Sequence, residues 1–143
     1  MISEDRFLAF AKRILSQSQI PEEECRTAIS RAYYSLYHIT GAILKKKYSF
    51  QLIEGIKKSS HRKKIHLARL NSLDRKYLSS FNLHQAFFLT LFDLGFKTMA
   101  FQFKDFRSKR NAADYDLDLS FEKTFSTIIV EEIDKLATEI RNL

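Results

Sequence analysis

Apolar residues recur at steps of three and four along most of this chain, which is the spacing of one face of an α-helix. Near the N-terminus the pattern predicts a helix over residues 3–18. A second helix is expected from Pro21 to about Lys47, with three glutamates at its start and three lysines at its end. Its expected core stripe consists of Cys25, Ala28, Ala32, Leu36 (or Ser35), Ile39 and Ile43.

The second half of the chain predicts a loop over residues 48–60, a short helix over 61–73 and two long helices. The first long helix is expected over residues 83–111, with Gly95 a mild internal weakness. Ser120 is expected to cap the last helix. The two expected stripes are Phe88, Phe92, Phe96, Met99, Phe103 and Phe106 on the first, and Phe121, Phe125, Ile129, Ile133, Leu136 and Ile140 on the last.

These stripes must be buried against one another. The pattern therefore predicts an all-α fold, an antiparallel up-and-down bundle of four long helices plus one short helix. Three glycines and one proline fit long helices better than the many tight turns of a β sandwich. A length of 143 residues suits one domain, which we expect to span residues 1–143.

Composition excludes several classes of site. A single cysteine, Cys25, rules out an intramolecular disulfide framework and a cysteine-based zinc site. The sequence has no Gly-rich phosphate loop and no helical histidine and carboxylate spacing for a metal, so we expect no metal and no cofactor. Charged residues stand where a secretory signal needs an apolar run, and Asp93 interrupts the most apolar stretch. We expect a soluble, cytoplasmic protein with no membrane partner.

The net charge of +7 is unevenly distributed. Residues 45–76 carry eleven Lys or Arg against two acids, a balance of +9, whereas residues 111–143 carry eight acids against three bases, a balance of −5. A basic segment of this density attracts a phosphate backbone, and it also keeps a protein soluble. Both interpretations stay open. The residues assigned to phosphate contact are Lys57, Lys58, Arg62, Lys63 and Lys64.

Three polar residues share one face of the second helix. Arg31, Tyr34 and His38 lie about 100° round the helix from the stripe that contains Ala32. Arginine can clamp a phosphate, tyrosine can stack a base, and histidine can transfer a proton near neutral pH. Each also has a structural explanation: an ion pair to another helix, packing at the rim of the core, or an ordinary helical histidine.

A second polar cluster follows the stripe of the fourth helix. Arg110 lies four residues beyond Phe106, where an arginine needs a partner. Asp114 lies four further on and is expected to pair with it. Tyr115 is expected to point toward a facing helix. We expect the segment from Arg110 to Tyr115 to lie against the Arg31 face of the second helix.

The segments "SRAYYSLYH" (residues 30–38) and "RNAADYD" (residues 110–116), with His61 between them, together resemble the HEPN superfamily, the higher eukaryotes and prokaryotes nucleotide-binding domain. The small stand-alone prokaryotic branch is the most similar. The resemblance implies a HEPN-like helical domain over residues 1–143 that forms homodimers and binds RNA or a nucleotide. It also implies a role in a toxin–antitoxin or defence system, beside a nucleotidyltransferase or another toxin-system partner.

Catalytic members of this superfamily place a histidine four to six residues after an arginine in a late helix, for metal-independent RNA cleavage. Here the histidine position after Arg110 is taken by Tyr115. A tyrosine hydroxyl is a poor proton acceptor at neutral pH. We therefore expect binding without efficient catalysis, through Arg31, Tyr34, Arg110, Asn111 and Asp114.

Two alternatives stay open at this point. The first is an atypical metal-independent endoribonuclease in which Arg110 binds the scissile phosphate and His38 or Tyr115 handles protons. The second is a helical scaffold or dimerisation protein whose polar cluster only fixes the register of the helices.

Overall fold

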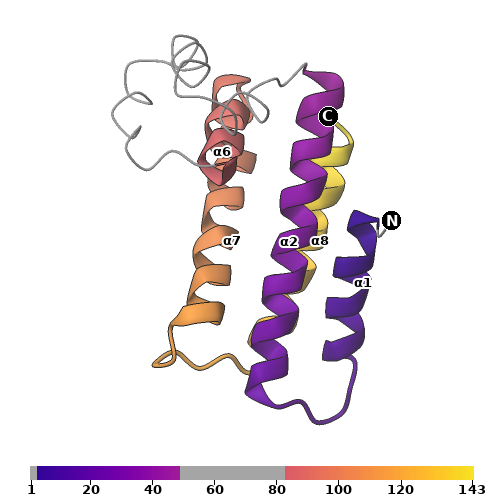
Figure 1. Cartoon of the computed structure of the whole chain (residues 1–143), viewed down its shortest axis with the longest axis vertical. Coiled ribbons are helices and arrows are strands. Elements are labelled where there is room, and N and C mark those ends of the chain that lie inside the picture. The colour runs from indigo at the N-terminus through magenta and orange to yellow at the C-terminus, as the bar shows by residue number, and fades with distance from the viewer. Residues whose placement is uncertain (1–2, 49–82) are drawn as a thin grey trace. The chain divides into compact units, whose positions relative to one another are not determined.

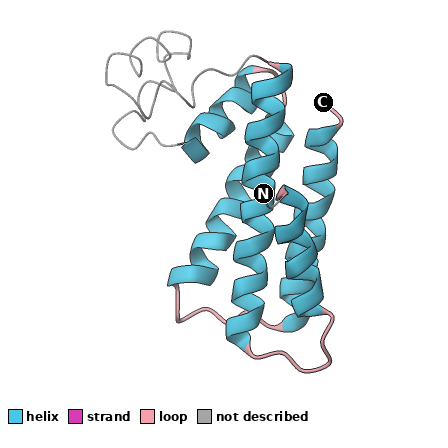
Figure 2. Cartoon of the chain, turned by 45° about the vertical axis from the view of Figure 1, so that its right-hand side comes forward, coloured by secondary structure: helices cyan, strands magenta, loops and turns pink. Residues whose placement is uncertain are grey.

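The computed structural model describes residues 3–48 and 83–143. Within these ranges the chain is all-α, with five helices and no strand (Figure 2). The predicted all-α class is confirmed for this part of the chain, and the antiparallel up-and-down bundle stays a prediction. The short helix expected over residues 61–73, almost all of the loop before it, and the basic residues Lys57, Lys58, Arg62, Lys63 and Lys64 lie outside the described residues. The helices are α1 (Glu4–Leu15), α2 (Glu22–Lys47), α6 (Leu83–Asp93), α7 (Lys97–Tyr115) and α8 (Lys123–Arg141).

The chain divides into two compact units. The first comprises Met1–Thr40 and Asp105–Leu143, and the second comprises Gly41–Lys104. Helices α2 and α7 each contribute residues to both units. The single domain expected over residues 1–143 stays a prediction.

Helices α1 and α8 lie side by side in the first unit (Figure 1). Two ion pairs join them: Lys12 Nζ lies 2.5 Å from Asp134 Oδ2, and Arg141 pairs with Asp5. Both pairs are largely exposed, so burial of apolar side chains supplies most of the stabilisation. The buried side chains of the two helices include Leu8, Ala11, Ile14, Leu15, Ile129, Ile133, Leu136 and Ile140.

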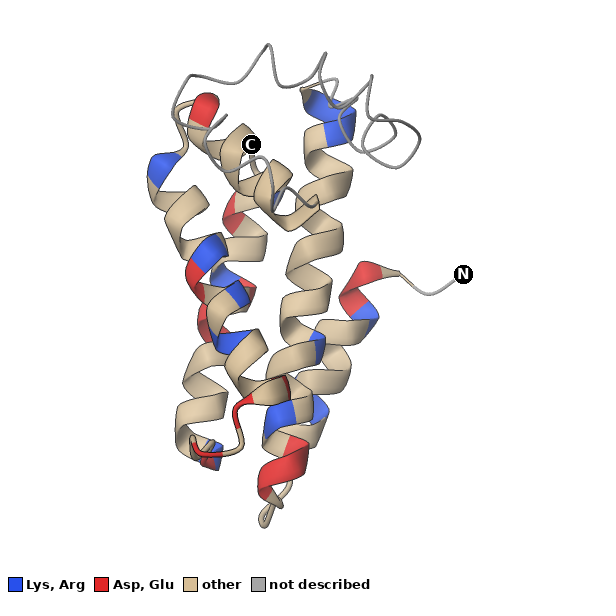
Figure 3. Cartoon of the chain, turned by 60° about the vertical axis from the view of Figure 1, so that its left-hand side comes forward, with Lys and Arg blue, Asp and Glu red and all other residues tan. Residues whose placement is uncertain are grey.

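Helix α2 agrees closely with its prediction. Acidic residues occupy its first turn and three lysines its last, which complements the helix dipole (Figure 3). The expected stripe is buried from Cys25 to Ile39, and both Ser35 and Leu36 are fully buried. Near the end of α2, Ile43 is only half-buried, and Leu44 is the buried residue instead.

The single helix expected over residues 83–111 is wrong, because the chain breaks at Gly95. Gly95 has a φ of 93°, a left-handed conformation that residues with a side chain rarely adopt. The Phe96 N–H donates to the Leu91 carbonyl (2.9 Å) and the Gly95 N–H to the Phe92 carbonyl (3.0 Å). This pair of bonds is a Schellman motif, which ends a helix at a left-handed glycine. Gly95 thus ends α6 rather than weakening a continuous helix.

Gly95→Ala is expected to lower the free energy of unfolding by about 1–2 kcal/mol, because alanine pays a steric cost in the left-handed region. No atom lies within 4 Å of a Cβ built at this position, so only the backbone opposes the change. Urea unfolding followed by circular dichroism measures the loss. Gly95→Asn is the control and should lose less, because asparagine tolerates this conformation. Equal stability of the parent and Gly95→Ala would show that no break is needed.

The break also divides the expected aromatic stripe. Phe103 and Phe106 are buried as predicted, but the four earlier residues of the stripe are only half-buried. The expected stripe crosses the end of α6. Its residues do not lie on one continuous face, because α6 and α7 run in independent directions. The half-buried residues are Phe88, Phe92, Phe96 and Met99, and α6 buries Ala86, Phe87, Leu89 and Leu91 instead.

Helix α8 starts later than expected. Its N-cap is Glu122, in extended conformation and with no side-chain capping bond, and Ser120 lies in the preceding loop. The expected stripe also drifts around the helix, because each step of four residues turns it by about 40°. Phe125 is 47% exposed, against the prediction, and the neighbouring Ser126 is fully buried.

Candidate functional site

A groove of about 490 Å³ runs along α2 and the C-terminal part of α7, within the first unit. It is called the α2–α7 groove below. The polar clusters predicted on the two helices meet there: Arg31 and Tyr34 come from α2, and Arg110 and Asp114 come from α7. The full lining is Glu23, Arg26, Thr27, Ser30, Arg31, Tyr34, Arg110, Ala113 and Asp114.

Arg110 and Asp114 form the predicted ion pair. The distance from Arg110 Nε to Asp114 Oδ2 is 2.9 Å, and the two side chains are 29% and 23% exposed. Arg110 Nη1 also donates to Asn111 Oδ1 (3.1 Å), and Ser30 Oγ donates to Asp114 Oδ2 (3.3 Å). Asp114 is therefore held from both helices. The charge of Arg110 is largely balanced before any ligand arrives.

Among the three arginines that line the groove, Arg31 has the fewest contacts in the described part of the chain. Its side chain is exposed, and within residues 3–48 and 83–143 no hydrogen bond or ion pair engages its guanidinium. Tyr34, one turn further along α2, is 41% exposed. A guanidinium can grip a phosphate with two parallel hydrogen bonds, and an exposed aromatic ring can stack on a base. The two residues together suit a ligand that carries both groups.

Sequence reasoning missed Arg26, which has the most contacts of the groove cations. Its Nη1 donates to the carbonyls of Ala113 (3.0 Å) and Asp116 (2.9 Å), and its Nη2 donates to that of Leu119. The last carbonyls of a helix have no partner within the helix, so Arg26 caps the end of α7. Although it lines the groove, its donors serve the backbone of α7 and the following loop.

Two further contacts fix the Arg26 side chain. Arg26 Nη2 lies 2.9 Å from Glu22 Oε1, and the guanidinium lies over the Phe121 ring, 4.8 Å from its centroid. The side chain is 13% exposed. The only sequence signal was the spacing of Glu22 and Arg26, which is common on exposed helices. Its carbonyl partners come from residues about ninety positions away and leave no local signal.

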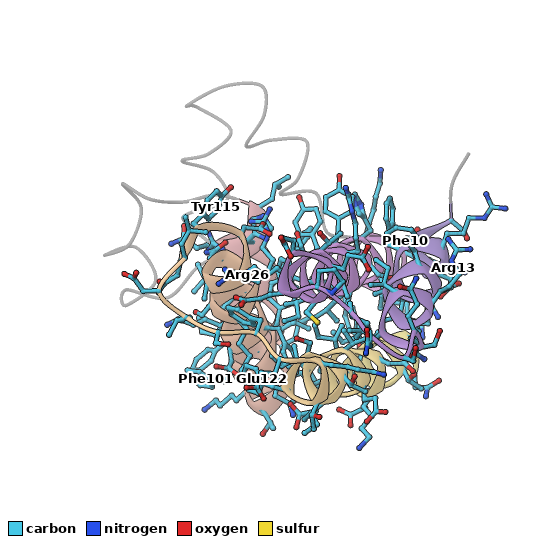
Figure 4. The ribbon with its side chains drawn as sticks, turned by 90° about the horizontal axis from the view of Figure 1, so that it is seen from below. Phe10, Arg13, Arg26, Phe101, Tyr115 and Glu122 are labelled. Atoms are coloured by element: carbon cyan, nitrogen blue, oxygen red, sulfur yellow. The ribbon has the colours of Figure 1, made fainter. Side chains whose placement is uncertain are left out.

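Tyr115 does not point into the groove, against the prediction. It is 75% exposed and extends away from the ribbon (Figure 4). Five residues separate it from Arg110, so the two side chains differ by about 140° around α7. Arg110 and Asp114 share the groove face because they are four residues apart.

His38 lies beside the groove but does not line it. Its ring packs edge-on against Tyr34, with the centroids 4.4 Å apart, and also contacts Tyr37 (5.1 Å) and Phe7 (6.4 Å). Burial lowers the pKa of His38 below its ordinary value, and the charge of Glu4 opposes this shift. The imidazole is therefore neutral at pH 7.

The lowered pKa of His38 predicts a pH dependence of stability. Between the folded-state pKa and the unfolded value of about 6.5, the unfolded chain binds more protons than the folded one. The free energy of unfolding should therefore fall as the pH drops below 6.5, and the fall should stop below the folded-state pKa. Urea unfolding from pH 7 to pH 5 measures this, and His38→Gln should remove its contribution. A curve for His38→Gln that parallels the parent would contradict the shift.

Other kinds of site find little support in the described residues. Within residues 3–48 and 83–143, no group of three His, Cys, Asp or Glu side chains could hold a metal ion. None of the helices in these ranges combines the length and apolar character needed to cross a bilayer.

No protein-family model, curated protein or solved structure matches this chain.

Proposed function

We propose that this chain is a HEPN-like module that binds RNA or a nucleotide in the α2–α7 groove, without efficient catalysis. The observation that carries the proposal is that Arg31 and Tyr34 line the same groove and are both exposed, and that Arg31 has no charge partner among the described residues. A nucleotide presents a phosphate and a base close together, which is the combination that these two side chains can bind.

The charges around Arg31 favour an anion at its end of the groove, because the carboxylate of Glu23, unpaired among the described residues, lies about 12 Å away along the α2 axis. Arg26 and Arg110 have carboxylate partners in Glu22 and Asp114, so their fields are largely cancelled. Arg31 has no such partner among the described residues and keeps its attraction for phosphate. Arg110 supports the ligand mainly by neutralising the charge of Asp114, which also lines the groove. The proposed phosphate contact is therefore Arg31.

The resemblance to the HEPN superfamily supports the rest of the proposal. It implies a homodimer, and it agrees with the cytoplasmic, antiparallel up-and-down bundle of four long helices plus one short helix that the sequence pattern predicts. It also places the protein in a toxin–antitoxin or defence system, beside a nucleotidyltransferase or another toxin-system partner.

A second candidate function is metal-independent RNA cleavage. The observation in its favour is that the neutral imidazole of His38 contacts Tyr34, a residue of the groove lining. A neutral imidazole can accept the proton of a 2′-hydroxyl, while an arginine stabilises the charge on the phosphate. Release of a cyclic phosphate product that is lost in His38→Ala would favour this candidate.

Anisotropy of a fluorescent single-stranded RNA tests the proposed binding function. Arg31→Ala should weaken binding by about tenfold or more, because a charge-assisted hydrogen bond contributes about 1.5–3 kcal/mol. The matched control is Arg13→Ala, which removes the same charge from an exposed position over Phe10, away from Arg26 (Figure 4). Its affinity should stay within about twofold of the parent. Equal affinities of the parent and Arg31→Ala, or no binding by the parent, would contradict the proposal.

A further inference from the structure

We propose that the α2–α7 groove binds two consecutive nucleotides, and that Glu23 reads a guanine base at the end opposite Tyr34. This inference rests on the proposed function, because it requires that the groove binds RNA. It adds the length of the ligand and the identity of one base.

The lining residues of α2 lie in a row along the groove. Glu23 and Tyr34 are eleven residues apart, which corresponds to about 16 Å along the helix axis. Arg31 stands between them, about 12 Å from Glu23 and about 4.5 Å from Tyr34 along the same axis. The groove therefore offers an aromatic ring at one end, a cation near that ring, and a carboxylate at the far end.

A single nucleotide cannot use both ends of this row. If its base stacks on Tyr34 and its phosphate contacts Arg31, no second base is left to reach Glu23. A second nucleotide joined through the phosphate at Arg31 extends toward Glu23 and fills the rest of the groove. Two bases flanking one phosphate thus match the order of the three side chains.

The carboxylate of Glu23 is available to a ligand. The residue is exposed, and no hydrogen bond or ion pair engages its side chain within the described residues. The nearby Arg26 is already paired with Glu22. Thr27 Oγ1 donates to the backbone carbonyl of Glu23, which leaves the side chain unaffected. An unpaired carboxylate disfavours an anionic ligand unless the ligand brings hydrogen-bond donors to it.

Guanine is the base that suits a carboxylate best. An ionised carboxylate only accepts hydrogen bonds, through two adjacent oxygens. The Watson–Crick edge of guanine presents two adjacent donors, N1–H and the N2 amino group, which can pair with both oxygens. Uracil presents one N–H between two carbonyl oxygens, and these repel a carboxylate. Bases of single strands are commonly read on this edge.

Calorimetric titration with unlabelled nucleotides tests both parts of the inference. The probes are the dinucleoside monophosphates ApG, GpA, ApU and UpA and the mononucleotides AMP and GMP. The tighter of ApG and GpA should bind at least tenfold more tightly than either mononucleotide, and at least fivefold more tightly than its uracil counterpart. Glu23→Gln should remove the preference for guanine. The matched control is Glu24→Gln, which removes the same charge one residue away and outside the groove lining, and it should keep the preference.

The outcomes separate this inference from the function on which it rests. Equal affinities for dinucleotides and mononucleotides would overturn the two-nucleotide site and leave RNA binding intact. A guanine preference that survives in Glu23→Gln would overturn the role of Glu23. Failure of every probe and of longer RNA to bind would overturn the inference together with the proposed function.

Discussion

Arg26→Ala is expected to lower the free energy of unfolding by about 3 kcal/mol, because a hydrogen bond to a charged group contributes about 1.5–3 kcal/mol and several are lost together. The guanidinium caps the end of α7, pairs with Glu22 and covers the Phe121 ring. Its removal takes the Arg26 donor away from the part-buried carbonyls of Ala113 and Asp116. Urea unfolding followed by circular dichroism measures the loss.

Two further variants make this prediction specific. Arg26→Lys keeps the charge but loses the planar fork of donors, so its loss of stability should be intermediate. Arg13→Ala removes an exposed arginine from α1 and should change the free energy of unfolding by no more than about 0.5 kcal/mol. A loss below about 1 kcal/mol for Arg26→Ala would mean that the cap of α7 does not depend on this side chain.

Arg110→Ala is expected to abolish RNA binding at concentrations that half-saturate the parent. The substitution removes a cation from the groove and also leaves the Asp114 carboxylate without its 2.9 Å partner. An unpaired carboxylate in the same groove as Arg31 repels the phosphate. The effect should therefore exceed that of Arg31→Ala. Anisotropy with the same single-stranded RNA measures it, after circular dichroism has verified the fold.

A double variant separates the two causes. Arg110→Ala with Asp114→Ala removes the pair together and should recover part of the lost affinity, because the repulsive carboxylate is gone. His38→Ala is the control and should bind RNA about as well as the parent, because His38 does not line the groove. Full binding by a folded Arg110→Ala protein would remove Arg110 from the site. Cleavage of RNA by the parent that His38→Ala eliminates would favour the ribonuclease instead.

The parts of the fold that follow from local pattern were predictable from the sequence. The bounds of α2 followed from Pro21, the glutamates of its first turn and the lysines of its last. The Arg110–Asp114 pair followed from the spacing of one helix turn. These features depend on residues a few positions apart, so the helical period is enough to find them.

The end of α6 at Gly95 could not be predicted from the helical spacing of the apolar residues. Apolar residues continue at steps of three and four on both sides of it, and a glycine inside a helix costs only about 1 kcal/mol. What decides the outcome is the left-handed conformation of Gly95, which ends α6 with two capping bonds. A continuous helix and a helix that ends at Gly95 differ in the direction that the chain takes after this residue. The spacing of apolar residues along the sequence does not record that direction.

The sequence predicted the two polar clusters of the candidate site, but it did not predict the contacts of Arg26 that support them. The shared face of Arg31 and Tyr34 and the inward direction of Arg110 followed from helical geometry. Arg26 was missed because its partners are backbone carbonyls, which carry no sequence signal. Tyr115 was assigned to the groove although helical rotation alone turns it away.

Titration of the ¹⁵N-labelled protein with a short single-stranded RNA shows where the ligand binds. If the α2–α7 groove is the site, the largest changes in amide chemical shift should cluster at Thr27, Ser30, Arg31, Tyr34 and Ala113. In Arg31→Ala the same changes should need at least about tenfold more RNA to saturate. Changes confined to residues outside the groove lining, or no saturable change at all, would contradict the groove as the RNA site.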